Sequence, residues 1–137
     1  NMLKECVDLK RELNSNTNLI GVTMLTSFDD DAINEIGISG TVNKNVENLS
    51  ALAFDCGMDG IVCSPMEISK VKEKFGSKLK VVVPGIRNQT DNTDDQKRTL
   101  SAKKAMEFGA DIIVVGRPIT SADSPGNAAE IFHQSIK

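Results

Sequence analysis

Four short runs of valine, isoleucine and leucine recur along the chain, and their order constrains the fold more than any other feature. Each run is almost continuously apolar, which is typical of strands buried on both faces of a parallel sheet. The sequence predicts strands over residues 19–25, 60–63, 80–83 and 112–115. Because parallel strands need crossover connections, we expect an α/β fold with the connecting helices outside the sheet.

Helical patterns occupy the stretches between these runs, and glycine or proline marks most of their ends. The predicted helices cover residues 2–14, 42–54, 65–75 and 101–108, and a last one runs from Pro125 to the C-terminus. A short helix is expected to be capped by Ser27, with the acidic residues 29–31 in its first turn. In the helix over residues 65–75, Met66 is expected to face inward together with Ile68 and Val71.

Two of the apolar runs end in loops suited to holding a phosphate. Pro84-Gly85-Ile86-Arg87 follows the third run, and Gly116-Arg117-Pro118 follows the fourth. Glycine lets backbone N–H groups approach the phosphate oxygens, and a guanidinium can bind two of them. Two such loops on successive strands indicate the phosphate site that follows strands seven and eight of a (β/α)8 barrel.

The length allows only part of such a barrel. The chain has 137 residues, whereas a complete barrel needs about 250. We therefore expect a single domain over residues 1–137, a parallel (β/α) half of a TIM barrel with about four strands and outer helices. A short internal repeat supports this interpretation, because glycine, aspartate and an apolar run occur at 57–63 and again at 109–115.

Composition argues against several kinds of partner. The net charge is −3 with acids and bases interspersed, so no basic surface for nucleic acid is expected. No apolar stretch approaches the roughly 18 residues of a membrane span. Three cysteines without a CxxC pattern indicate free thiols in a reducing cytoplasm. The single histidine is too little for a metal site, and no cofactor is expected.

The order of several short motifs resembles the orotidine 5′-phosphate decarboxylase family, specifically the C-terminal half of its bacterial type. The matching segments are residues 22–27 (VTMLTS), 59–64 (DGIVCS), 83–87 (VPGIR), 95–98 (DQKR), 109–111 (GAD) and 114–120 (VVGRPIT). The resemblance implies that the chain supplies strands five to eight of a barrel. It also implies a carboxy-lyase that converts orotidine monophosphate to uridine monophosphate and CO2 in pyrimidine synthesis.

On the pyrimidine side of the site, the resemblance implies three substrate-binding residues. Thr26 would bond the ring, and Pro84 would pack beside the ring near the departing carboxylate. Gln96, on a mobile loop after the third run, would reach across the closed site toward the phosphate. Without the family pattern, Gln96 would be interpreted as an exposed loop residue, and Thr26 as a hydroxyl that satisfies a backbone group.

On the phosphate side, the resemblance implies that Gly116 and Arg117 hold the phosphate by backbone and guanidinium. Arg87 would anchor the mobile loop or help with the phosphate. The helix beginning near Pro125, or a short turn before it, is expected to complete the anion pocket. The alternative is that Gly116 and Arg117 are only a strand end with a surface arginine.

One part of the family pattern is missing. The charged catalytic array of the family centres on Asp-x-Lys-x-x-Asp in its N-terminal half, and no such motif occurs here. We therefore assign no catalytic residue to this chain, expect it to be inactive alone, and expect it to need an N-terminal half. The alternative is a catalytically dead remnant, or a module that binds another phosphorylated ligand. Self-association is also expected, because half a barrel leaves two strand edges and one apolar face uncovered.

Overall fold

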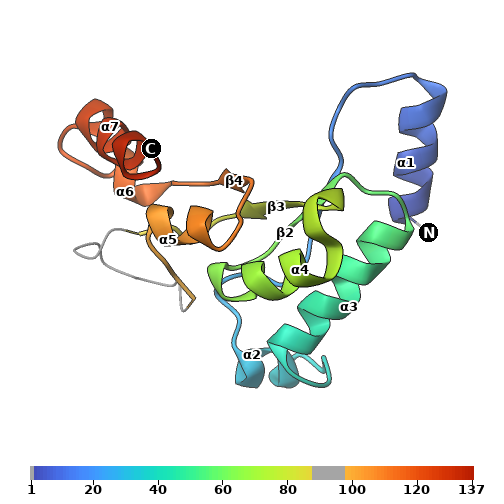
Figure 1. The fold of residues 1–137 in the computed structure, drawn as a ribbon. Coiled ribbons are helices and arrows are strands. Elements are labelled where there is room, and N and C mark those ends of the chain that lie inside the picture. Colours follow the sequence, from blue (N-terminus) through green and yellow to red (C-terminus); the bar gives the residue numbers. More distant parts are fainter. Residues whose placement is uncertain (1, 88–97) are drawn as a thin grey trace.

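The structure, a computed structural model, describes residues 2–87 and 98–137 and contains one parallel sheet flanked by helices (Figure 1). Its strands are β1 (Ile20–Val22), β2 (Gly60–Val62), β3 (Lys80–Val83) and β4 (Ile112–Ile113). They pair in chain order, and every pair is parallel. The predicted α/β half-barrel is confirmed, although β1, β2 and β4 are shorter than the apolar runs that predicted them.

Helices follow or precede each strand, as predicted. They are α1 (Met2–Glu12), α2 (Asp30–Glu35), α3 (Val42–Asp55), α4 (Ile68–Phe75), α5 (Ala102–Glu107), α6 (Arg117–Thr120) and α7 (Pro125–Ser135), with the 3₁₀ turns η1 (Pro65–Glu67) and η2 (Gly76–Lys78). The sequence pattern does not predict α6. In the described ranges, no helix combines the length and the apolar character needed to cross a bilayer.

Two local expectations are wrong. Asp29 rather than Ser27 caps α2, because it directly precedes the first helical residue and its carboxylate accepts the Ala32 N–H at 3.0 Å. Met66 is 55 % exposed, whereas Glu67 is 2 % exposed. Residues 65–67 form a 3₁₀ turn with about three residues per turn, which shifts the inward face from Met66 to Glu67.

The core lies between the sheet and the helices on one side of it. Ile61 and Val81 stand side by side on β2 and β3, are fully buried, and face this core. Figure 1 shows α3 and α4 along that side of the sheet, and their buried side chains include Val46 and Ile68. This layer is the ordinary helix-on-sheet packing of an α/β fold.

The opposite face of the sheet is apolar but open. The strand register places four side chains in one row across the sheet, which we call the inner row: Val22, Val62, Val82 and Ile112. At its two ends, Val22 is 63 % exposed and Ile112 is 49 % exposed. The strands are thus apolar on both faces, as predicted, but only one face is buried by the described residues. In a closed barrel such inward side chains fill the interior.

Two aspartates tie the amino ends of the strands together. Each carboxylate accepts one backbone N–H at the start of the neighbouring strand and one lysine ammonium from a helix. The bonds run from Leu19 N–H (2.7 Å) and Lys10 Nζ (2.7 Å) to Asp59, and from Val81 N–H (2.7 Å) and Lys72 Nζ (2.6 Å) to Asp111. These aspartates occupy equivalent places in the two copies of the sequence repeat, so the repeat has a structural counterpart.

These contacts also set the ionisation of the two carboxyl groups. Partial burial on its own would raise the pKa of Asp59 and of Asp111. The lysine and backbone hydrogen bonds favour the charged form more strongly, so the net pKa of each lies below its ordinary value. The amino-terminal edge of the sheet is therefore held by charged, paired carboxylates.

Candidate functional site

The predicted site residues lie beyond the carboxyl ends of the strands. Since the strands are parallel, the segments that follow them meet at one edge of the sheet, where (β/α)8 barrels carry their active sites. Thr26 follows β1, Pro84 and Arg87 follow β3, and Gly116 and Arg117 follow β4. The structure thus places these five at the same edge.

Gln96, predicted to reach the phosphate side, lies outside the described residues. Its role remains a prediction from the sequence.

After β1, two threonines have different surroundings. Thr23 extends the sheet pairing, because its N–H (3.1 Å) and its hydroxyl (2.6 Å) both donate to the Val62 carbonyl. Its hydroxyl is therefore occupied by a backbone group. Thr26 is 8 % exposed. The two residues that precede it in the chain are Met24, which is buried, and Leu25, which is exposed.

The loop after β3 holds Arg87 inside the protein. Gly85 has a φ of 76°, which a residue with a side chain rarely adopts, and this allows the chain to turn after Pro84. Beyond the turn, Ile86 pairs in parallel with Leu100, and the Arg87 N–H donates to the Leu100 carbonyl at 3.0 Å. The Arg87 side chain is buried, and its Nη1 donates to the Ile86 carbonyl at 2.8 Å. This geometry favours the loop-anchoring role over direct phosphate contact.

The loop after β4 is open to solvent. Gly116 immediately precedes the short helix α6, and its carbonyl accepts the N–H groups of Ile119 (2.9 Å) and Thr120 (3.0 Å). A Cβ added at Gly116 would have no neighbouring atom within 4 Å, so packing does not demand glycine there. Gly116 and Arg117 are exposed. An anion could approach this backbone directly, which is the use of glycine in phosphate loops.

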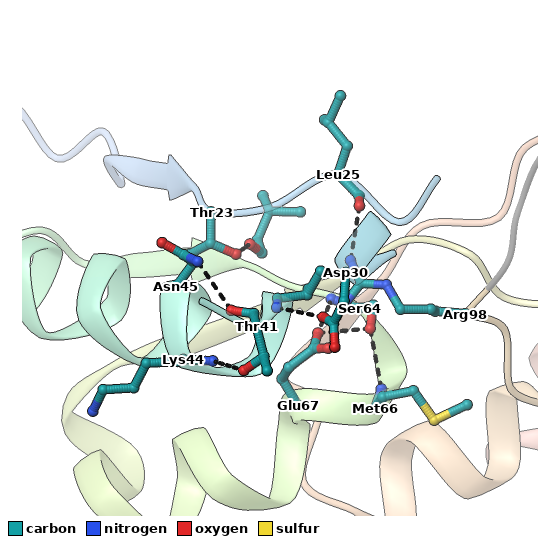
Figure 2. Close-up of polar contacts among 12 residues, drawn as sticks. Thr23, Leu25, Asp30, Thr41, Lys44, Asn45, Ser64, Met66, Glu67 and Arg98 are labelled. Atoms are coloured by element: carbon teal, nitrogen blue, oxygen red, sulfur yellow. Dashed lines mark hydrogen bonds and ion pairs between the residues drawn. The ribbon is translucent and has the colours of Figure 1, made fainter. Parts of the chain in front are cut away.

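A buried polar cluster that sequence reasoning did not single out lies at the same edge (Figure 2). Ser64 follows β2, and its N–H (2.9 Å) and hydroxyl (2.6 Å) both donate to Glu67 Oε2. The Ser64 oxygen in turn accepts the Met66 N–H at 3.3 Å, which completes a capping box at the start of η1. Ser64 is fully buried and the Glu67 side chain is 3 % exposed.

The second oxygen of Glu67 forms an ion pair with Arg98. Arg98 Nη1 donates to Glu67 Oε1, while Arg98 Nη2 donates to the Leu25 carbonyl at 2.7 Å. One arginine thereby joins the segments that follow β1 and β2 (Figure 2). The pattern Ser-x-x-Glu could have predicted the capping box. No local signal could have predicted the pairing with Arg98, which is 31 residues away from Glu67.

The two candidate reactive features here are the thiol of Cys63, next to this cluster, and side chains that could bind a metal ion. Cys63 directly follows β2 and is fully buried, and burial, followed by the charge of Glu67, raises the pKa of its thiol to about 12. Such a thiol is neutral at physiological pH and packs as an apolar group. In the described part of the chain, no three His, Cys, Asp or Glu side chains gather where they could hold a metal ion.

Comparison with known proteins gives a consistent result. The model of the "Orotidine 5'-phosphate decarboxylase / HUMPS family" matches residues 1–132. An orotidine 5′-phosphate decarboxylase of Nitrosomonas eutropha is 41% identical over 133 residues, which cover 97% of this chain and 55% of that protein. One of Wolbachia from Brugia malayi is 42% identical over 135 residues, covering 98% of this chain and 59% of the relative.

A solved structure agrees with these sequence relatives. The crystal structure of orotidine 5′-phosphate decarboxylase from Lactobacillus acidophilus superposes with a TM-score of 0.74 and 36% sequence identity. The superposition covers 90% of this chain and 50% of that chain. The chain therefore spans about half the length of the relatives that it matches.

Proposed function

Because the chain belongs to the orotidine 5′-phosphate decarboxylase / HUMPS family and forms a C-terminal half of its fold, we propose that it binds the phosphate and the pyrimidine for such an enzyme. The enzyme would be a cytoplasmic carboxy-lyase that converts orotidine monophosphate to uridine monophosphate and CO2. In this proposal the strands of the chain are strands five to eight of the barrel.

The observation that carries the proposal is the shared location of the predicted binding residues. Thr26, Pro84, Gly116 and Arg117 follow three different strands, yet the parallel sheet brings them to one edge. A phosphate held at Gly116 and Arg117 would leave its nucleoside to extend along this edge toward Thr26. Arg87, buried at the root of the β3 loop, would hold that loop in place.

We further propose that this half binds but does not catalyse. The sequence lacks Asp-x-Lys-x-x-Asp, which the family resemblance makes the source of the charged groups that act on the substrate carboxylate. Binding without groups that favour the transition state leaves the barrier unchanged. The open inner row supports a need for a second half that covers it, supplied by an N-terminal half or imitated by a second copy of the chain.

Calorimetric titration with uridine monophosphate tests the proposal. Arg117→Ala removes a charge-assisted hydrogen bond that contributes about 1.5–3 kcal/mol, so affinity should fall roughly ten- to a hundredfold. The control is Arg11→Ala, which removes an exposed arginine paired with Asp8 on the distant helix α1. Equal affinity of the wild type and Arg117→Ala would reject the phosphate site.

A turnover assay tests the division of labour. The purified chain should not decarboxylate orotidine monophosphate, and addition of an N-terminal half from a relative should restore turnover. Turnover by the pure chain would contradict the proposal. Tighter binding of ribose 5-phosphate than of uridine monophosphate would favour the alternative, a module for another phosphorylated ligand.

A further inference from the structure

Glu67 and Arg98 form hydrogen bonds beyond those that the capping box of η1 requires. The capping box of η1 uses only one oxygen of Glu67, and both donors of Ser64 point to that oxygen. The other oxygen is bound by Arg98, whose side chain is 13 % exposed. Because a buried carboxylate needs a compensating charge, the position of Arg98 is tightly coupled to Glu67.

The second bond of Arg98 reaches the predicted binding edge. The Leu25 carbonyl that accepts from Nη2 belongs to the peptide unit that also contains the Thr26 nitrogen. A peptide unit is planar, so holding its carbonyl orients the Thr26 backbone as well. The same Leu25 carbonyl accepts the Phe28 N–H at 3.0 Å, which fixes the turn that follows.

The arginine also sits next to the return of the chain toward β3. Leu100 lies two residues after Arg98, pairs with Ile86, and accepts the Arg87 N–H at 3.0 Å. The segments after β1, β2 and β3 are therefore all connected through one side chain and its immediate neighbours. Gly116 and Arg117 belong to a separate segment, which follows β4.

The chemistry of the two contacts favours arginine over lysine. Nη1 and Nη2 point to two different acceptors, Glu67 and Leu25, and the planar guanidinium holds both bonds at a fixed mutual angle. A lysine at this position would keep the charge, but it would present one nitrogen on a flexible stem. Its bond to one acceptor would not determine where the other lies.

We propose that Arg98 and Glu67 are positioning residues that set the Leu25–Thr26 peptide for the nucleotide base. We call the two bonds of Arg98, to Glu67 and to the Leu25 carbonyl, the brace. That the brace serves binding of the base rests on the proposed function, whereas its effect on the ends of the strands does not. Neither residue needs to touch the ligand. Loss of either residue should weaken the binding of the base, and it should leave the binding of phosphate by the loop after β4 unchanged.

Variants separate this role from general stability. Arg98→Lys keeps the charge and loses the double contact. The double variant Arg98→Met with Glu67→Gln removes the brace without leaving a lone buried charge, and the glutamine oxygen can still accept from Ser64. Arg11→Met is the matched control, because Arg11 is exposed on α1 and 70 % of its side chain is accessible.

Amide hydrogen exchange measured by NMR is the first readout and needs no ligand. The amides of Phe28 and Arg87 report on the braced edge, while those of Leu19 and Val81 report on the amino-terminal edge. Loss of the brace should speed exchange about tenfold at the first two and leave the other two unchanged. No change at Phe28 and Arg87, or an equal rise at all four, would overturn the proposal.

Ligand affinity is the second readout, measured with uridine monophosphate and with inorganic phosphate. Both brace variants should bind uridine monophosphate about tenfold more weakly, as expected for the loss of one well-placed hydrogen bond, and phosphate about as tightly as the wild type. An equal loss for both ligands would overturn the positioning role. Failure of the wild type to bind uridine monophosphate would reject the proposed function instead, and the exchange experiment would still decide on the brace.

Discussion

Replacing Gly60 by alanine should destabilise the sheet, and the structure supplies both the reason and the control. Gly60 lies in β2 between Ile20 of β1 and Lys80 of β3. A Cβ at this position would come within 2.6 Å of the Lys80 carbonyl oxygen and 2.9 Å of Ile20 Cδ1. The carbonyl is backbone held by the strand pairing, so the neighbouring strand itself must move.

The expected magnitude follows from two opposing effects. Overpacking of this kind costs about 1–3 kcal/mol, while replacing a strand glycine by alanine contributes about 0.5–1 kcal/mol through the lower entropy of the unfolded chain. Gly60→Ala should therefore lower the free energy of unfolding by about 1–2 kcal/mol. Gly21→Ala in β1 is the control, because its Cβ would make contacts of ordinary van der Waals length, the nearest with the flexible end of Met58 at 3.5 Å. That variant should be slightly more stable than the wild type.

Urea unfolding followed by circular dichroism compares the two variants at one protein concentration. With an m-value of about 1–3 kcal/mol/M, the midpoints of Gly60→Ala and Gly21→Ala should differ by on the order of 1 M. Equal midpoints at equal m-values would refute the strand register around Gly60. A concentration-dependent midpoint would instead report that association contributes to the measured stability.

Further predictions concern pH, thiol reactivity and assembly. The pKa values of Asp59 and Asp111 are lowered on folding, so their contribution to stability is present above their ordinary value of 3.8 and is lost as the pH falls below it. Urea midpoints between pH 7 and pH 3 should therefore fall less steeply in Asp111→Asn than in the wild type, and an unchanged slope would contradict this. Cys63, with a pKa of about 12, should react with a thiol reagent at pH 8 on the order of a hundredfold more slowly than the exposed Cys6 until the protein is unfolded. Comparable rates in the native protein would show that Cys63 is not buried. Light scattering should detect association of the wild type at micromolar concentration and a shift toward monomer in Val22→Lys, because a charge in the inner row opposes its burial. A monomeric wild type would argue against self-association.

Most of the fold could be predicted from local patterns. The prediction for β3 agrees with the structure at both ends, α3 extends one residue beyond its predicted end, and α5 is one residue shorter than predicted at each end. The errors occurred where two local signals compete. Ser27 and Asp29 are both good caps, and only the start of the first helical turn decides between them. Met66 was misplaced because the sequence does not reveal that its turn is 3₁₀ rather than α-helical.

The candidate site was predictable in part. Thr26, Pro84, Gly116 and Arg117 stand next to recognisable strand ends, so their common edge follows from parallel pairing. The inward position of Arg87 was not predictable, because arginines after strands are usually exposed. Its backbone N–H is bound by Leu100, a partner 13 positions further along the chain that pairs with the continuation of β3.

The sequence by itself determined the alternation of strands and helices, the half-barrel length and the family motifs, because periodicity, capping and turn preferences act over a few neighbouring residues. The tertiary structure alone decided that the inner row is on the open face, although the strands are largely apolar on both faces. It also decided that Arg98 binds both Glu67, 31 residues away from it, and the Leu25 carbonyl, 73 residues away from it. Such contacts depend on how whole strands and helices pack. Packing buries the Glu67 carboxylate, and the buried charge then requires a cationic partner, which is Arg98.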